Sequence, residues 1–152
     1  MTYVRAITLL SMFIVLTACQ GDDRAQGVHV IHSPDSYGVF VKRLKTAITA
    51  SGFTISDGAC GKCSIRTIDV PEKDTEIISV YQPDLALHMM QAGAAAGGDV
   101  PLRFYVTKLD DGTARLTYQQ PSTSLMVFNA PKLKPIAENL DKVFAEIIEQ
   151  VN

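Results

Sequence analysis

Two cysteines in the segment Cys60-Gly-Lys-Cys63 carry the sharpest chemical signal in this 152-residue sequence. In a bacterial protein that is exported beyond the inner membrane, thiols meet an oxidising environment. There such a pair closes a short loop as a disulfide. A redox role would make Cys60 the attacking thiol, with Lys62 favouring its thiolate. The sequel Ser-Ile-Arg-Thr-Ile is typical of a strand, however, and supplies no helix dipole to the thiol. We interpret the pair as a disulfide, with redox exchange, metal or haem binding, and no function as alternatives.

The histidines give a weaker signal for a metal. His29 and His32 stand three residues apart on an expected strand, so they point to opposite faces and are poorly placed to share one ion. His88 precedes Met89 and Met90, and imidazole with thioether suits copper or haem iron. Helical spacing favours Met89 as a core residue instead. We therefore expect no cofactor, and the weak metal candidates are Cys60, Cys63 and His88.

A further group of polar side chains surrounds the turn at Gln82-Pro83. If the strand before this turn neighbours the two strands after it, phenol, amide and guanidinium groups converge in a shallow site for a small anionic or planar ligand. The alternative is that Tyr118 is a core aromatic and that Arg103 is a solvated outward residue. The candidate pocket residues are Tyr81, Gln82, Pro83, Arg103, Tyr105 and Tyr118.

The enzyme classes with short sequence signatures find no support in this chain. No serine–histidine–acid order, phosphate loop or paired-carboxylate spacing is present, so hydrolase and kinase interpretations have no basis. These absences leave the question of enzymatic activity open, and they lean toward a protein that is not an enzyme.

The elements that must position these side chains follow from the spacing of apolar residues. We expect a helix with Ser33 as N-cap, Pro34 in its first turn and Ser51-Gly52 at its end. A second helix should begin at Pro83. Alternation of apolar and polar residues predicts the strands. They cover residues 28–32, 53–56, 64–70, 77–81, 102–106 and 113–118, with a short extended piece at 124–128.

The last part of the chain decides the fold class. Asp110-Asp-Gly112 predicts a hairpin, and Asn129-Ala-Pro131 opens a final helix whose apolar stripe continues for about five turns. A stripe of this width must lie across the sheet. The expected fold is α+β, a mostly antiparallel sheet with two to three helices packed on one face, as a two-layer sandwich. The other face then needs cover or a second subunit, which leaves a homodimer open.

Short motifs in this order resemble the family called domain of unknown function 302. The resemblance covers roughly residues 35–147 and implies a compact α+β domain, sometimes dimeric, without an established reaction. Family members commonly have Gly-Asn before the proline of the central turn, whereas this chain has Tyr81-Gln82. The motifs that carry the resemblance are Leu44, Gly52-Phe53, Tyr81-Gln82-Pro83, Met89, Val100-Pro101-Leu102-Arg103, Asp111-Gly112 and Tyr118-Gln119-Gln120-Pro121.

The N-terminus predicts export and lipid attachment. Arg5 precedes an apolar run, residues 6–16, that is too short to span a bilayer comfortably. Leu16-Thr17-Ala18-Cys19 then resembles the lipobox of bacterial lipoproteins, which implies that Cys19 carries acyl chains such as palmitate. An ordinary secretory signal or an N-terminal anchor helix is the alternative. We expect residues 1–18 to be the signal peptide, 19–27 a polar tether and 28–152 one domain.

Charge and length limit the partners of the mature chain. Removing residues 1–18 leaves 134 residues with 13 Lys+Arg against 16 Asp+Glu, a net charge near −3 without a basic cluster, so nucleic acid is excluded as an expected partner. We expect a lipid-anchored envelope protein with a periplasm-facing domain, on the outer membrane because Gln20 follows the cysteine. Its expected role is non-enzymatic binding of a small ligand or partner. The alternatives are a thiol-redox or metal protein using Cys60 and Cys63, and a structural dimerisation module.

Overall fold

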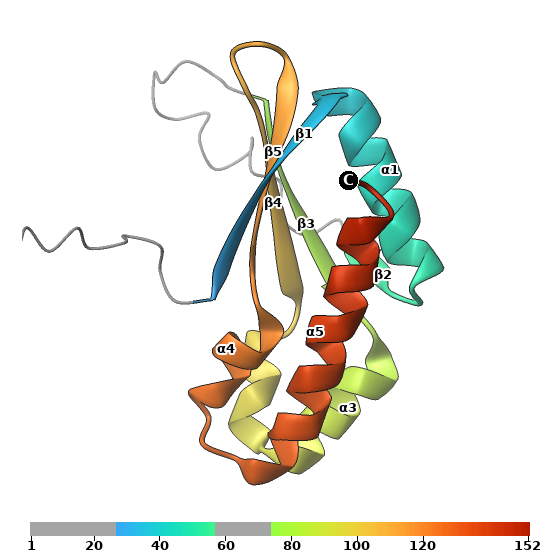
Figure 1. Cartoon of the computed structure of the whole chain (residues 1–152). Helices are drawn as coiled ribbons and strands as arrows, with labels where there is room; N and C mark the ends of the chain where they lie inside the picture. The colour runs from blue at the N-terminus through green and yellow to red at the C-terminus, as the bar shows by residue number, and fades with distance from the viewer. Residues whose placement is uncertain (1–26, 57–73) are drawn as a thin grey trace, which may run out of the picture.

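Five antiparallel strands form one sheet in the computed structural model, which describes residues 27–56 and 74–152. The order across the sheet is β1-β5-β4-β3-β2, so the strand that begins the domain lies at one edge (Figure 1). Each neighbouring pair is antiparallel. The strands are β1 (Val28–Ser36), β2 (Thr54–Ser56), β3 (Thr75–Tyr81), β4 (Leu102–Lys108) and β5 (Thr113–Gln119).

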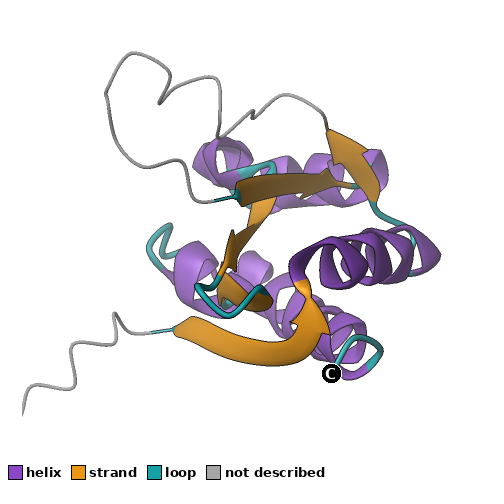
Figure 2. Ribbon diagram, turned by 90° about the horizontal axis from the view of Figure 1, so that it is seen from above, coloured by secondary structure: helices purple, strands orange, loops and turns teal. Residues whose placement is uncertain are grey.

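The helices divide into two groups. Two long helices cover one face of the sheet, which curves around them (Figure 2). They are α1 (Tyr37–Ala50) and α5 (Lys134–Glu149). The shorter elements gather at one end of the sheet (Figure 1). They are α3 (Pro83–Ala92), α4 (Pro121–Met126) and the 3₁₀ turns η1 (Ala94–Asp99) and η2 (Pro131–Leu133). The expected α+β class, an antiparallel sheet with helices packed on one face, is confirmed.

The core lies between the sheet and the two long helices. Alternation along β4 sends Phe104 and Val106 to the helix side, while α5 contributes Phe144 from its apolar stripe. The rings of Phe104 and Phe144 stack with centroids 4.7 Å apart. Burying each such side chain stabilises the fold by about 1.5–3 kcal/mol. Other fully buried large side chains are Phe40, Leu44, Ile48, Ile78, Leu116, Leu140 and Ile147.

The first helix starts later than its N-terminal signals predict. Ser33-Pro34 does not open a helix; instead β1 continues to Ser36, with a break in its register against β5 between Ser33 and Ser36. The Ser33 hydroxyl accepts a hydrogen bond from the Asp35 N–H at 3.2 Å, and α1 begins at Tyr37. Hydrogen bonds to β5 satisfy backbone N–H and C=O groups of β1 that a helix would otherwise have satisfied. Tertiary contact therefore overrides the local helix signal.

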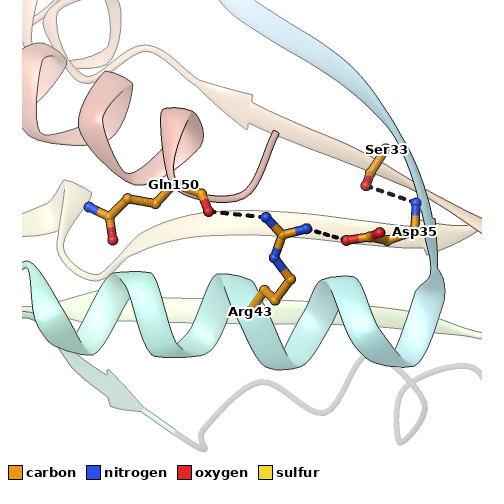
Figure 3. A network of polar contacts seen from close by, with 4 residues as sticks. All are labelled: Ser33, Asp35, Arg43 and Gln150. Atoms are coloured by element: carbon orange, nitrogen blue, oxygen red, sulfur yellow. Dashed lines mark hydrogen bonds and ion pairs between the residues drawn. The ribbon is translucent and has the colours of Figure 1, made fainter.

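The same junction is fastened to the end of the last helix. Arg43 of α1 forms an ion pair with Asp35 and donates a second hydrogen bond, at 3.2 Å, to the carbonyl oxygen of Gln150 (Figure 3). Gln150 is the C-cap of α5, whose last carbonyls carry the negative end of the helix dipole. One guanidinium group therefore links β1, α1 and α5.

The segment after β5 also differs from its prediction. Residues 124–128 were expected to be extended, but Pro121–Met126 forms the helix α4. Pro121 occupies the first helical position, where its missing N–H costs nothing, and the Asp141 carboxylate of α5 accepts a hydrogen bond at 2.9 Å from the next N–H, that of Ser122. The final helix is likewise preceded by η2 and begins at Lys134.

Two glycine turns match the sequence prediction. Gly112 has φ +84° in the hairpin between β4 and β5, and Gly52 has φ +83° after α1, where the Phe53 N–H donates to the carbonyl oxygen of Ile48. Both positions lie in the left-handed region that glycine adopts without strain. The loop and strand expected at 57–70 lie outside the described residues.

Candidate functional site

Three residues of the expected pocket lie on or beside the sheet face that α1 and α5 leave open. Arg103 and Tyr105 alternate with buried Phe104, and Arg103 pairs across the strands with Ser79. Tyr81, two residues further along β3, therefore shares this face. The side chains of Tyr81 and Tyr105 are 37 % and 41 % exposed. This part of the expected set does share one face of the sheet, with both tyrosine side chains partly exposed.

Tyr118 lies on the opposite face, so the six expected pocket residues do not converge. Its ring packs against Phe104 and Phe144, with centroids 5.8 and 5.9 Å away. Burial, and then the nearby Asp141 carboxylate, raises the pKa of the Tyr118 phenol above its ordinary value. Tyr118 is thus a core aromatic with a polar edge, which was the alternative interpretation.

The turn at Gln82-Pro83 encloses almost no space. Gln82 is the N-cap of α3 without a side-chain cap hydrogen bond, and Pro83 is exposed at the first helical position. Beneath the turn a cavity of about 10 Å³ is lined by core residues such as Met89 and Leu102. That volume approaches the minimum for one water molecule, so the residues that the structure describes enclose no ligand-sized space beneath the turn.

The histidines are separated in space as their spacing predicts. His29 stacks on Tyr118 with ring centroids 5.0 Å apart, on the helix side of the sheet, whereas His32 pairs with Arg115 on the open face. His88 is exposed on α3, next to the fully buried Met89. Within residues 27–56 and 74–152, no three His, Cys, Asp or Glu side chains gather closely enough to hold a metal ion.

A polar cluster that the sequence did not reveal lies beside Tyr118. Gln120 donates from Nε2 to Asp141 Oδ2 at 2.7 Å, and its Oε1 lies 3.4 Å from His29 Nε2. The same carboxylate accepts the Ser122 N–H. The cluster joins β1, α5 and the junction between β5 and α4, and both oxygens of the half-buried Asp141 carboxylate accept hydrogen bonds in it. We assign it a structural role, that of fixing α4.

An open, shallow groove lies between α3 and the start of α5. Its volume is about 580 Å³, within the range of small-molecule pockets. Its lining follows from helical spacing, because side chains three or four positions apart share one face of each helix. The lining residues are Leu85, His88, Gln91 and Ala92 from α3, with Lys132, Pro135, Ile136 and Asn139 from η2 and α5.

The groove combines an apolar floor with hydrogen-bond donors. Leu85 and Ile136 are half-buried and pack against the core. Of the described residues that line the groove, Lys132 is the one that is charged, and none is a carboxylate. Among the residues that the structure describes, Lys132 forms no ion pair, so its ammonium group is available to an anion. The groove can hold a molecule with an apolar body and a negatively charged group.

Sequence reasoning singled out His88 but not the groove around it. The signal was present as two faces at helical spacing. Leu85, His88 and Ala92 lie on α3, and Lys132 of η2 precedes Ile136 and Asn139 of α5. Nothing in the sequence indicated that these faces lie side by side.

Comparison with known proteins places the chain in a family. A family model described as "Domain of unknown function DUF302" matches residues 29–151. The chain belongs to the DUF302 family. A crystal structure titled "uncharacterized conserved protein DUF302 from Bacillus stearothermophilus" superimposes on it with a TM-score of 0.73 and 19 % sequence identity, covering 84 % of this chain and 100 % of the other. At this identity the likeness establishes the DUF302 fold alone. A search of curated proteins gave no match.

Three expected site residues of this DUF302 chain lie outside the described residues. They are Cys19, expected to carry lipid, and the expected disulfide pair Cys60 and Cys63, and all three roles stay predictions.

Among residues 27–56 and 74–152, no helix combines the length and apolar character that crossing a bilayer requires.

Proposed function

We propose that this DUF302 chain is a lipid-anchored protein of the cell envelope whose domain binds a small amphipathic anion in the groove between α3 and α5. The observation that carries the proposal is the groove itself. It offers about 580 Å³ of space, an apolar floor and one lysine whose charge no described acidic side chain neutralises. In this account the chain binds and presents its ligand and does not transform it.

The chemistry of the lining selects the ligand class. The Lys132 ammonium group can donate up to three hydrogen bonds to an anion, and the amides of Gln91 and Asn139 can add neutral ones. Charge-assisted hydrogen bonds are about twice as strong as neutral ones, so Lys132 should supply most of the selectivity for charge. Leu85 and Ile136 favour an apolar body on the same ligand. A carboxylate on a short hydrocarbon chain is the simplest molecule of this kind.

The anchoring part of the proposal is supported by the N-terminal sequence. Leu16-Thr17-Ala18-Cys19 follows a short apolar run with Arg5 before it, as in lipoprotein signals. Acyl chains on Cys19 bury methylene groups worth about 0.8 kcal/mol each, so two or three chains hold a protein stably on a membrane. Gln20 after the cysteine supports the outer membrane, with the domain facing the periplasm.

Titration with octanoate, followed by NMR, tests the groove. Octanoate should shift the backbone amide signals of His88, Gln91 and Asn139, and octylamine, of the same length but opposite charge, should not. Lys132→Ala should weaken octanoate binding about tenfold, the effect of removing one charge-assisted hydrogen bond. The matched control is Lys42→Ala, an exposed lysine on α1, which should bind octanoate as the unaltered chain does.

Two results of this titration contradict the proposal. One is a set of octanoate shifts outside α3 and α5, for example on the open sheet face around Tyr81 and Tyr105. The other is equal binding by the Lys132→Ala and Lys42→Ala variants, which would show that the lysine in the groove does not select the anion.

The open sheet face favours a second candidate, a dimerisation module. Val30, Tyr81 and Tyr105, on the face away from α1 and α5, are 49 %, 37 % and 41 % exposed, and a second copy of the chain would bury them. A melting temperature that rises with protein concentration supports this candidate, because mass action stabilises a folded dimer. A melting temperature independent of concentration contradicts it.

A further inference from the structure

The two most exposed large apolar side chains of the described residues are neighbours at the end of α4. Met126 is 75 % exposed and Val127 is 76 % exposed, more than any other large apolar residue described. We call this pair the apolar tip. Exposed apolar residues that stand together mark contact sites for proteins or membranes. Helix α3, which carries the half-exposed Leu87 and Met90, lies at the same end of the molecule (Figure 1).

The chain enters the domain directly beside α4. The Gln120 N–H donates to the carbonyl oxygen of Gly27 at 2.7 Å. Gly27 also lies so close to Thr123 that a Cβ atom on it would stand 2.3 Å from the threonine Oγ1. Thr123 and Val127 are separated by about 6 Å of helix at 1.5 Å per residue. The apolar tip is therefore close to the point where the N-terminal segment joins the fold.

The length of that N-terminal segment limits how far the tip can stand from a membrane. From Cys19 to Gly27 the chain advances eight residues, which span at most about 27 Å when fully extended. A lipid on Cys19 would thus hold Gly27, and α4 beside it, within this distance of the bilayer surface. The opposite end of the sheet, where β4 turns into β5, would be held farther away (Figure 1).

We propose that the apolar tip, Met126 and Val127, inserts into the surface of the bilayer and fixes the orientation of the domain on the membrane. The inference rests on the proposed lipid anchoring, because the tether brings the tip to the lipid. The charge of the segment around the apolar tip agrees with contact to a bilayer. Residues 121–133 contain no carboxylate and one charged residue, Lys132, which suits a surface of anionic lipids. Docking would also place the end of the molecule that carries the groove next to the membrane, where amphipathic anions are concentrated.

A single tryptophan can report on the contact, because the chain contains none. We would reconstitute the full-length lipidated protein as Val127→Trp into phosphatidylethanolamine–phosphatidylglycerol vesicles, with and without bromine atoms on the acyl chains. The matched control is Val39→Trp on α1, a valine that is 52 % exposed away from α4. Brominated chains should quench emission from Val127→Trp about twofold and shift it to the blue, while emission from Val39→Trp should not change.

Flotation of the same vesicles separates failure of the anchor from failure of the docking. Protein that floats with the vesicles, with Val127→Trp quenched no more than Val39→Trp, overturns the docking and leaves the anchoring intact. Protein that does not float overturns the anchoring, and the docking with it. A blue shift in the unlipidated Cys19→Ser chain that grows with protein concentration, without vesicles, would mean that a second copy covers the tip. That result also overturns the proposal.

Discussion

At the scale of single residues, Asp141 ties α5 to the start of α4, a link that the sequence did not reveal. Its two oxygens accept hydrogen bonds from Gln120 and from the Ser122 N–H, at 2.7 and 2.9 Å. Its charge also helps to raise the pKa of Tyr118. The carboxylate, which belongs to α5, thus satisfies the Ser122 N–H in the first turn of α4.

Asp141→Asn should lower the free energy of unfolding by about 1 kcal/mol. Asparagine keeps the shape of the side chain, but it removes the negative charge at the start of α4 and the acceptor for one of the two hydrogen bonds. Urea denaturation of the variant measures the loss. Glu146→Gln, an exposed carboxylate on the same helix, is the control and should change stability by less than about 0.5 kcal/mol. Equal losses in the two variants would contradict this role of Asp141.

The free energy of unfolding should fall at alkaline pH because of Tyr37. Burial first, and then the charges of Glu76 and Asp74, raise the pKa of its phenol to about 12. Between the ordinary tyrosine pKa of about 10 and this value the folded chain binds the proton more tightly than the unfolded chain, so the contribution is complete below pH ~10 and is lost as pH rises to ~12. Because the ring is only half-buried, the effect should be about 1 kcal/mol.

Urea denaturation of the unaltered chain and Tyr37→Phe at a series of pH values checks this dependence. The free energy of unfolding should fall more steeply above pH ~10 in the unaltered chain, because phenylalanine has no proton to lose. Parallel curves for the two proteins would show that Tyr37 does not contribute.

The positions of the aromatic residues show how much of the expected pocket could be predicted from the sequence. Alternation placed Arg103 and Tyr105 on one face of their strand and Tyr118 with Leu116 on one face of the next. Which of these faces coincide depends on the register, in which Phe104 pairs with Tyr118. Register is set by packing across the sheet, so convergence at the Pro83 turn could not be tested from the sequence.

At the scale of the elements, glycines at two kinds of position should respond oppositely to the same substitution. Gly112 has φ +84°, where a Cβ atom strains the backbone, so Gly112→Ala should destabilise the protein by about 1 kcal/mol. Gly38 lies in α1 with open space around a Cβ atom, so Gly38→Ala should stabilise it by about 0.5–1 kcal/mol. Thermal unfolding of both variants provides the measurement. A shift of the melting temperature in the same direction for both would contradict these assignments.

Elements with strong local signals were predicted, and elements created by tertiary contact were not. Helix α1 (Tyr37–Ala50) carries its own apolar stripe and the glycine after its end, and α5 carries its own apolar stripe. The hairpin carries its Asp-Gly turn. The extension of β1 to Ser36 depends on pairing with β5. Helix α4 depends on Asp141, twenty positions after Pro121. No window of neighbouring residues contains either of these contacts.

At the scale of the whole molecule, the groove is a product of topology. Leu85 and Lys132 are 47 positions apart, and the hairpin of β4 and β5 lies between them in the chain. The sheet order brings α3 and η2 to one end of the domain (Figure 1). From the sequence one could predict two apolar helix faces, but only the fold shows that they lie side by side. The TM-score of 0.73 shows that another DUF302 protein shares this fold.

Native mass spectrometry of the chain recovered from the periplasm, without added ligand, tests the central claim most directly. The Cys19→Ser chain should carry an adduct with the mass of an amphipathic anion. This adduct should be absent from the same chain with Lys132→Ala and present in the same chain with Lys42→Ala. A chain with no adduct, or one whose adduct survives Lys132→Ala, would contradict binding in the groove between α3 and α5.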